Sequence, residues 1–246
     1  MESLFFSKRG KKITPSYFLP FGSSEVKRIS YAVSFGVTEY PEELKKIILP
    51  LIQKFNSLGV RENTGKKILE DMNFNNVNLV PDPTLLLTDE KLNKLISGTF
   101  NKNSDIFFYI LQENQSIINR TLNFSKNTLK LKVISNKTKP FMSIENWLLN
   151  IKSTKCVVTN SFHGVIFSIL FKKPFVVIPI ENRLKGMNDR ITTLLNNFNL
   201  EYRILDVYDE TIFEELLNTP IDWNKIEEKR NIMKNNAKEF LKTSLT

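Results

Sequence analysis

The only histidine of the chain, His163, lies in the turn Asn160-Ser161-Phe162-His163-Gly164. Histidine exchanges a proton near neutral pH, so it is suited to general acid or base catalysis. Ser161 is a favourable N-cap residue, which would place His163 and Gly164 in the first turn of a helix. The backbone N–H groups of a first turn favour an anion. The turn is therefore a candidate anion site beside a proton donor. On residue type alone a packed or surface histidine is the more common case, and the position at a strand-to-helix turn makes the two interpretations equal.

The elements on either side of this turn predict a βαβ unit. The β-branched run 156–159 indicates a buried parallel strand, and the dense apolar segment 162–172 indicates a helix. After Pro174, a second apolar run at 175–178 indicates another strand, at a spacing that suits a crossover. In an open α/β sheet such a strand-to-helix junction lies at the carboxyl end of a strand, where these folds bind ligands.

The rest of the chain predicts two consecutive β-α arrays, and hence an α/β fold with parallel sheets. In the first part we expect strands at 28–36, 57–62 and 77–80, a helix starting at Pro41, and a helix at 64–72. In the second part we expect strands at 105–111 and 129–134, helices at 114–126, from Ser143 onward and at 188–198, an edge strand at 202–205, and a closing amphipathic helix at 224–242. We divide the chain into a partial unit at 1–88 and a second unit at 89–246, both facing a common cleft.

Composition narrows the class of protein. The 246 residues contain no apolar run long enough to span a membrane and no signal peptide pattern, so we expect a cytoplasmic protein. A single cysteine excludes an internal disulfide and clustered Cys/His metal sites. The net charge of +9 comes from evenly spread lysines without a nucleic-acid-binding signature. It would suit anionic small molecules, or peripheral association with an anionic membrane.

Five stretches, in order, resemble the polysaccharide pyruvyl transferase family. They are KRISYAVSFG (27–36), LGVRENTGKKIL (58–69), VPDPTLLL (80–87), IENWLLNIKSTKCVVTNSFHGVIFSILFKKPFVVIP (144–179) and GMNDRITTLL (186–195). The S-F-H-G turn is similar to the bacterial capsule and exopolysaccharide branch. The resemblance implies a GT-B-like arrangement of two Rossmann-like domains. Family members begin with a further N-terminal segment, so we expect the first unit to be truncated. Many members carry arginine where this sequence has Ser161.

The resemblance implies transfer of a pyruvyl group from phosphoenolpyruvate to two hydroxyls of a sugar or lipid-linked oligosaccharide, without a metal or cofactor. It implies that His163 is the acid that protonates the methylene carbon. Phosphoenolpyruvate is a small, highly charged anion that needs cationic donors and backbone N–H groups. The residues expected to bind it are Arg61 as first choice, Arg190 and Arg183 as second choices, and Asn160, Ser161 and Gly164 in the turn.

Two carboxylates are candidates for deprotonating the sugar hydroxyl, namely Asp82 and Glu62, although Asp82 alternatively caps a proline-rich turn. Two other functions stay open. A GT-B glycosyltransferase that uses a nucleotide sugar should carry a glycine-rich phosphate loop and a nucleotide-binding glutamate, and neither is evident. A truncated, non-catalytic remnant would expose a sheet edge near residues 29–36.

Overall fold

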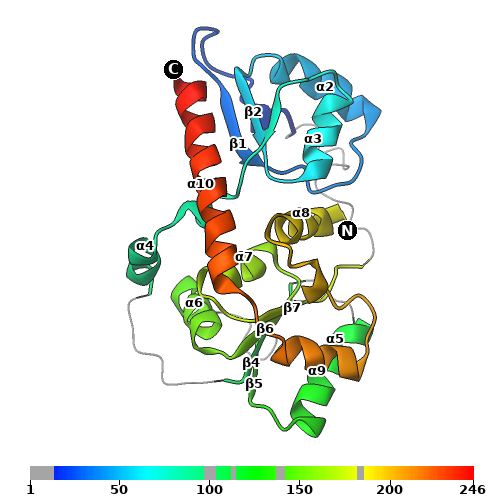
Figure 1. The fold of residues 1–246 in the computed structure, drawn as a ribbon. Helices are drawn as coiled ribbons and strands as arrows, with labels where there is room; N and C mark the ends of the chain where they lie inside the picture. The colour runs from blue at the N-terminus through cyan, green and yellow to red at the C-terminus, as the bar shows by residue number, and fades with distance from the viewer. Residues whose placement is uncertain (1–13, 97–103, 112–114, 137–141, 182–185) are drawn as a thin grey trace. The chain divides into compact units, whose positions relative to one another are not determined.

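A computed structural model confirms the α/β fold, with two sheets whose strands are all parallel (Figure 1). The structure describes residues 14–96, 104–111, 115–136, 142–181 and 186–246. Contacts divide the chain into a first unit, 1–82 with 233–246, and a second unit, 83–232. The sequence-based division at residue 88 assigned the whole closing helix to the second unit, whereas the end of that helix packs in the first.

The first unit has a three-stranded sheet in the order β1-β2-β3. Its elements are η1 (Thr14–Phe18), β1 (Ile29–Val33), α2 (Glu42–Ile52), β2 (Ser57–Val60), α3 (Asn63–Glu70) and β3 (Val77–Leu79). The helical spacing of Leu44, Ile48 and Ile52 gives α2 one apolar face, and this face packs with α3 and with Leu58 and Val60 of β2. These side chains form the core on one side of the sheet.

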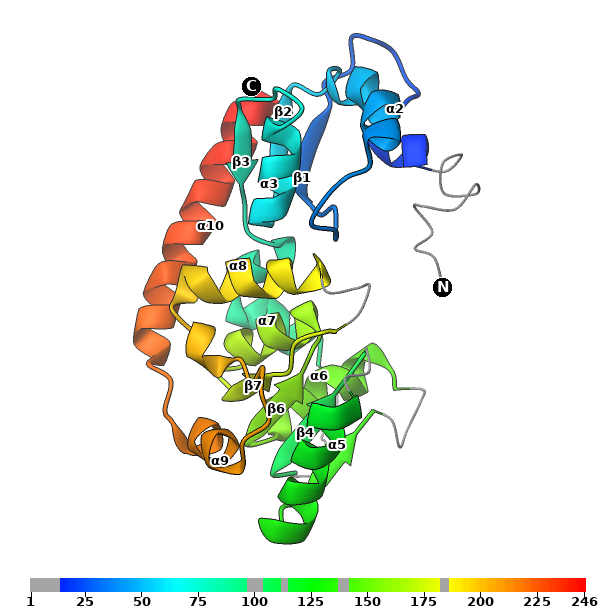
Figure 2. The ribbon, with the colours of Figure 1, turned by 90° about the vertical axis from the view of Figure 1, so that its right-hand side faces the viewer.

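The other side of this sheet is covered by α10 (Trp223–Leu245), the closing helix, which Figure 2 shows running beside β3. Phe240 of α10 packs with Ala32 and Val80. The close approach requires Gly59 in β2, because a Cβ atom there would lie 2.9 Å from the Ser30 carbonyl oxygen and 3.0 Å from the Phe240 ring. Strand β1 also contains a bulge between Ser30 and Val33, where Ala32 adopts a φ of 52°.

The second unit has a four-stranded sheet in the order β5-β4-β6-β7. Its first elements are η2 (Pro83–Leu86), α4 (Asp89–Lys94), β4 (Ile106–Tyr109), α5 (Gln115–Asn123), the π-helical turn η3 (Phe124–Thr128), β5 (Val133–Ser135) and α6 (Ile144–Ser153). Then follow β6 (Cys156–Thr159), α7 (Phe162–Leu170), β7 (Phe175–Val177), α8 (Asn188–Phe198), η5 (Glu201–Arg203), α9 (Glu210–Asn218) and the first part of α10. The βαβ unit expected around the histidine is therefore present as β6-α7-β7.

Helices cover both faces of this second sheet. Alternate strand residues such as Ile106, Phe108 and Val158 pack against α5 and α9 in one apolar cluster. On the opposite face, Tyr109 of β4 contacts Trp147 of α6, and Trp147 contacts Phe167 of α7. The result is an α/β/α layered unit in which all four residues of β6 are buried, as a continuous apolar run predicts.

One predicted element of the second unit is wrong, and another was not predicted. Residues 202–205 do not form an edge strand: Glu201–Arg203 is a 3-10 helix, and Ile204 makes an isolated bridge to Val177. The cause is Arg203, which is fully buried and donates from Nε to the Phe175 carbonyl oxygen at 2.7 Å. Helix α9 follows, and the Asp209 side chain caps it by accepting from the Ile212 N–H group.

Candidate active site

The histidine turn is fixed by hydroxyl groups on both sides of the strand-to-helix junction. Thr159, the last residue of β6, donates from Oγ1 to the Tyr109 carbonyl oxygen at 2.6 Å, and the same atom accepts from the Ser161 N–H group at 3.0 Å. Ser161 is the N-cap of α7 and accepts from the Gly164 N–H group at 3.3 Å. The expected cap is confirmed, and His163 is the second residue of the helix.

Glycine is needed at position 164 because the turn is tightly packed. A Cβ atom on Gly164 would lie 2.6 Å from Thr159 Oγ1 and 3.2 Å from the Ser161 Cβ atom. The first distance is shorter than any tolerated contact, so a larger residue would displace the Thr159 hydroxyl. Gly164 therefore allows the helix to start directly above the end of β6.

The turn lies at the topological switch point of the second sheet. Counted along the chain, β4 is the first strand of this sheet, β5 pairs on one side of it and β6 on the other. Doubly wound sheets bind ligands at the carboxyl ends of the strands where the order reverses in this way. Asn160 ties the two strand ends together, since its Oδ1 accepts from the Leu111 N–H group at 2.8 Å.

His163 is exposed, whereas Asn160, Ser161, Phe162 and Gly164 around it are buried. The His163 ring lies 5.4 Å from the Phe162 ring, between centroids. The guanidinium of Arg190, on α8, lies 5.6 Å from the centroid of the same Phe162 ring. The second unit therefore brings the predicted residues Asn160, Ser161, His163, Gly164 and Arg190 to one region, and Arg183 lies outside the described residues.

The three candidates of the first unit also come together, at the carboxyl edge of its sheet. Arg61 and Glu62 follow β2, and Asp82 follows β3. Arg61 Nη1 lies 2.8 Å from Asp82 Oδ2, and Arg61 Nε lies 3.8 Å from Glu62 Oε2. Arg61 also contributes the charged group to the lining of a largely apolar cavity of about 510 Å³ beside β1. One arginine thus faces two buried carboxylates.

Glu62 holds the backbone that follows β1. Its Oε1 accepts from the N–H groups of Phe35 at 2.8 Å and Gly36 at 3.5 Å. Burial raises the pKa of the Glu62 carboxyl, although the hydrogen bonds from Ser34, Phe35 and Gly36 and the charge of Arg61 oppose this. With 1% of its surface exposed, Glu62 is placed to position this loop.

A family model for polysaccharide pyruvyl transferases matches residues 3–182. The chain belongs to the polysaccharide pyruvyl transferase family. The matched region includes Arg61, Glu62, Asp82 and the whole histidine turn, and it ends before Arg190. No curated protein matches the chain. Within the residues that the structure describes, no helix combines the length and apolar character needed to cross a membrane.

Two other kinds of reactive group are relevant among the described residues, a cysteine thiol and a metal cluster. Cys156 is buried, and this burial raises the pKa of its thiol to about 12, so a reactive thiolate is not formed near neutral pH. Among the described residues, no three His, Cys, Asp or Glu side chains are grouped as metal ligands. The histidine turn is therefore the candidate site.

Two asparagines that were not predicted complete the carboxyl edge of the second sheet. Asn136 follows β5 and makes paired hydrogen bonds with Ile110, accepting from its N–H group at 3.0 Å and donating to its carbonyl oxygen at 2.9 Å. Asn188 pairs in the same way with Ile180, at 2.9 and 2.8 Å, and begins the helix that carries Arg190. Their sequence signal is only an asparagine next to a strand or helix end.

Proposed function

We propose that this protein transfers a pyruvyl group from phosphoenolpyruvate to two hydroxyls of a sugar, forming a pyruvate ketal during capsule or exopolysaccharide biosynthesis. The observation that carries the proposal is an exposed histidine, His163, in the first turn of α7 at the switch point of a parallel sheet. Membership of the pyruvyl transferase family supports the reaction class. A cytoplasmic location stays a prediction from the sequence.

The proposed chemistry begins with protonation. The imidazolium of His163 gives its proton to the methylene carbon of phosphoenolpyruvate, which becomes a methyl group while C2 becomes electrophilic. One sugar hydroxyl then adds to C2 and loses its proton. The second hydroxyl then forms a bond to C2 while the bond between C2 and the phosphate oxygen breaks. The ketal closes, and inorganic phosphate leaves with the proton of the second hydroxyl.

The anionic substrate requires positive groups near this histidine. The N-terminus of α7 supplies a partial positive charge, and Arg190 supplies a full charge beside Phe162. In the first unit we propose Arg61 as a further ligand for the phosphate or carboxylate, because a guanidinium can bind both oxygens of such a group. Asp82, the partner of Arg61, and Glu62 stay candidates for accepting the hydroxyl proton.

The first test replaces the proposed acid. With phosphoenolpyruvate and a panel of sugar acceptors, His163→Gln should lower acceptor-dependent phosphate release by about 100- to 10,000-fold, the usual contribution of a general acid. Glu145 provides a matched control because it is the second residue of α6, after the Ser143 cap. Glu145→Gln should keep full activity. Release that continues unchanged in the His163 variant would overturn the assignment.

Two further measurements separate the reaction from its alternatives. In D₂O the ketal methyl group should carry one deuterium, because its third hydrogen comes from solvent through the acid. Phosphoenolpyruvate should raise the melting temperature, and a uridine diphosphate should not. Stabilisation by the nucleotide alone would instead favour a glycosyltransferase. A folded protein that neither ligand stabilises would indicate a non-catalytic chain.

A further inference from the structure

Lysines gather at the amino-terminal edge of the second sheet, opposite the end that carries the histidine turn. Because β5, β4, β6 and β7 are parallel neighbours, the residues before each strand share one edge. Lys132 directly precedes β5, Lys155 directly precedes β6, and Lys173 lies two residues before β7. Three further lysines lie within three residues of these in the sequence. We call the six together the lysine edge: Lys130, Lys132, Lys152, Lys155, Lys172 and Lys173.

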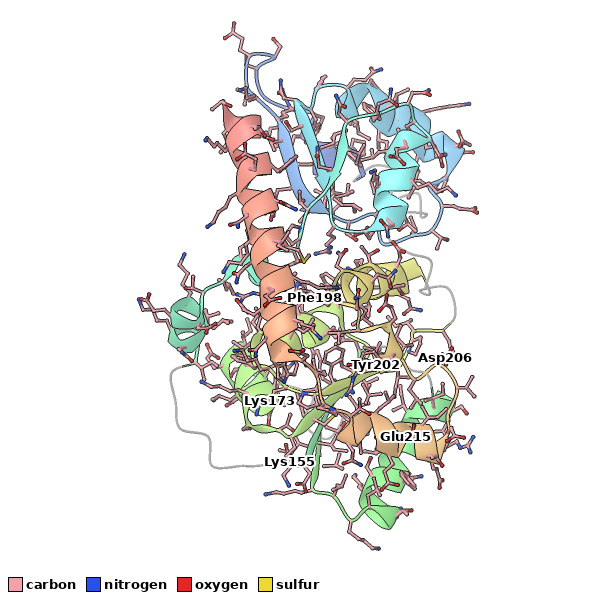
Figure 3. The ribbon with its side chains drawn as sticks, in the orientation of Figure 1. Lys155, Lys173, Phe198, Tyr202, Asp206 and Glu215 are labelled. Atoms are coloured by element: carbon pink, nitrogen blue, oxygen red, sulfur yellow. The ribbon has the colours of Figure 1, made fainter. Side chains whose placement is uncertain are left out.

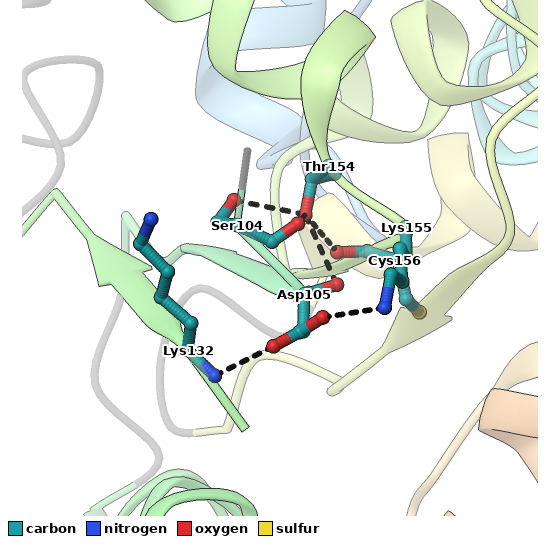
Figure 4. Close-up of polar contacts among 6 residues, drawn as sticks. All are labelled: Ser104, Asp105, Lys132, Thr154, Lys155 and Cys156. Carbon is teal, nitrogen blue, oxygen red and sulfur yellow. Dashed lines mark hydrogen bonds and ion pairs between the residues drawn. The ribbon is translucent and has the colours of Figure 1, made fainter. Parts of the chain in front are cut away.

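Little negative charge compensates the lysine edge. Asp105, directly before β4, lies 2.8 Å from Lys155 Nζ through Oδ1 and accepts from the Lys132 backbone N–H group through Oδ2. Figure 4 shows these contacts and the Lys132 ammonium pointing away from Asp105. Among the described residues named here, six lysines and one aspartate give a formal charge of +5 (six minus one).

Two further contacts of the edge, both between described residues, leave its positive charge in place. Lys152 Nζ is 3.1 Å from Asn93 Oδ1, a neutral partner. Burial lowers the pKa of Lys173, and the charge of Lys152 lowers it further, which indicates repulsion between the two ammonium groups. Figure 3 labels Lys155 and Lys173 in the second unit and, to their right in this view, Glu215 on α9, a helix with three glutamates.

We propose that the lysine edge docks on an anionic membrane surface. Lysines act as hydrated point charges, which suits a diffuse layer of lipid phosphates, whereas specific phosphate recognition favours arginine. The residues directly before the four strands are Lys132, Asp105, Lys155 and Pro174, and none of these four is an aromatic residue of the kind on which nucleic-acid bases stack. Docking at the amino edge would leave the opposite, carboxyl edge of this sheet open to substrates.

The test compares vesicles of phosphatidylcholine with vesicles that also contain phosphatidylglycerol, by co-sedimentation at low salt. The variant Lys132→Gln/Lys152→Gln/Lys173→Gln spares Lys155 and its pair with Asp105. Its affinity for the anionic vesicles should fall by about 100-fold, since each lysine near such a surface contributes roughly a factor of five. High salt should abolish the binding.

A second triple variant controls for net charge. Lys46, Lys67 and Lys238 are exposed lysines on α2, α3 and α10, all in the first unit. Replacing all three with Gln changes the net charge equally. Unchanged vesicle binding in this control supports the lysine edge. Equal losses in the two variants, binding to phosphatidylcholine alone, or lysine-edge binding to duplex RNA but not to vesicles would overturn the proposal. Because it does not depend on the proposed reaction, phosphate release from a soluble acceptor should be the same in all three proteins.

Discussion

At the scale of single residues, the histidine turn depends on one hydroxyl group. Thr159 Oγ1 joins β6 to β4 and to the start of α7, and Gly164 leaves just enough room for it. A hydroxyl that donates and accepts at once, in a buried site, is expensive to displace because both of its partners would lose a hydrogen bond. The position of His163 therefore depends on Thr159 and Gly164, which together fix the turn around it.

Gly164→Ala should destabilise the protein by about 1–3 kcal/mol, the usual cost of overpacking, and should lower activity beyond any loss of folded protein. Gly65 is a matched control, since it is the third residue of α3 just as Gly164 is the third residue of α7. A Cβ atom on Gly65 would meet its nearest atom at 3.4 Å, an ordinary contact. Thermal unfolding of Gly65→Ala should show equal or higher stability. Equal losses in both variants would contradict the role given to Thr159.

Two carboxyl groups should give opposite pH dependences of stability. Burial raises the pKa of Glu62 from 4.5, so its contribution to folding is lost as pH rises through the folded pKa. Contacts with Lys155 and the Lys132 N–H group lower the pKa of Asp105 from 3.8, so its contribution is lost as pH falls. Glu62→Gln should remove the first trend and Asp105→Asn the second.

Urea unfolding at a series of pH values checks both trends. Trp147 and Trp223 lie in the second unit, so tryptophan fluorescence follows the unit that contains Asp105, and far-UV circular dichroism also includes the unit that contains Glu62. Wild-type and variant curves that stay parallel over the whole pH range would show that these carboxyl groups titrate alike in the folded and unfolded chains.

At the scale of elements, α10 is the helix that covers the second face of the first sheet. Phe240 is 8% exposed and lies against the Tyr31 ring at 6.2 Å between centroids. Nearer its start, the buried Arg230 donates to the Leu85 and Leu87 carbonyl oxygens and pairs with Glu227. These contacts anchor the two parts of the helix, one in each unit.

Phe240→Ala should lower the free energy of unfolding of the first unit by about 3–5 kcal/mol, because it empties a buried aromatic site. Leu245→Ala is the control on the same part of the helix, since Leu245 is 68% exposed, and its cost should stay within about 0.5 kcal/mol. Far-UV circular dichroism should report the loss, and tryptophan fluorescence from the second unit should change less. Similar effects from the two variants would show that Phe240 is not part of the core.

At the scale of the whole molecule, the spacing of apolar residues predicted most elements, because each strand or helix has a recognisable spacing within its own residues. The helix at 188–198 and the Ser161 cap are examples. The failures involve distant partners. Arg203 replaced a predicted strand because it reaches the Phe175 carbonyl oxygen, 28 positions away. Asn136 and Asn188 depend on which strand ends lie side by side, and a single sequence does not contain that order.

The candidate site shows the same division. The turn around His163 could be recognised from residue types, because N-cap, glycine and strand signals are local. The pairing of Arg61 with Asp82, 21 positions apart, and the burial of Glu62 required the sheet. Likewise, the lysines that precede separate strands can be recognised as one edge only when the strand order β5-β4-β6-β7 is known.

Helix α10 belongs partly to each of the two units, and this has a consequence for how the protein folds while it is being translated. Residues 1–82 leave the ribosome well before the segment that covers their sheet, 233–246. The second unit can fold as it emerges, whereas the first must wait for Phe240 with an uncovered apolar face and is exposed meanwhile to chaperones, proteases and misassembly. Limited proteolysis of stalled nascent chains should therefore find the N-terminal residues protected later than the middle of the chain.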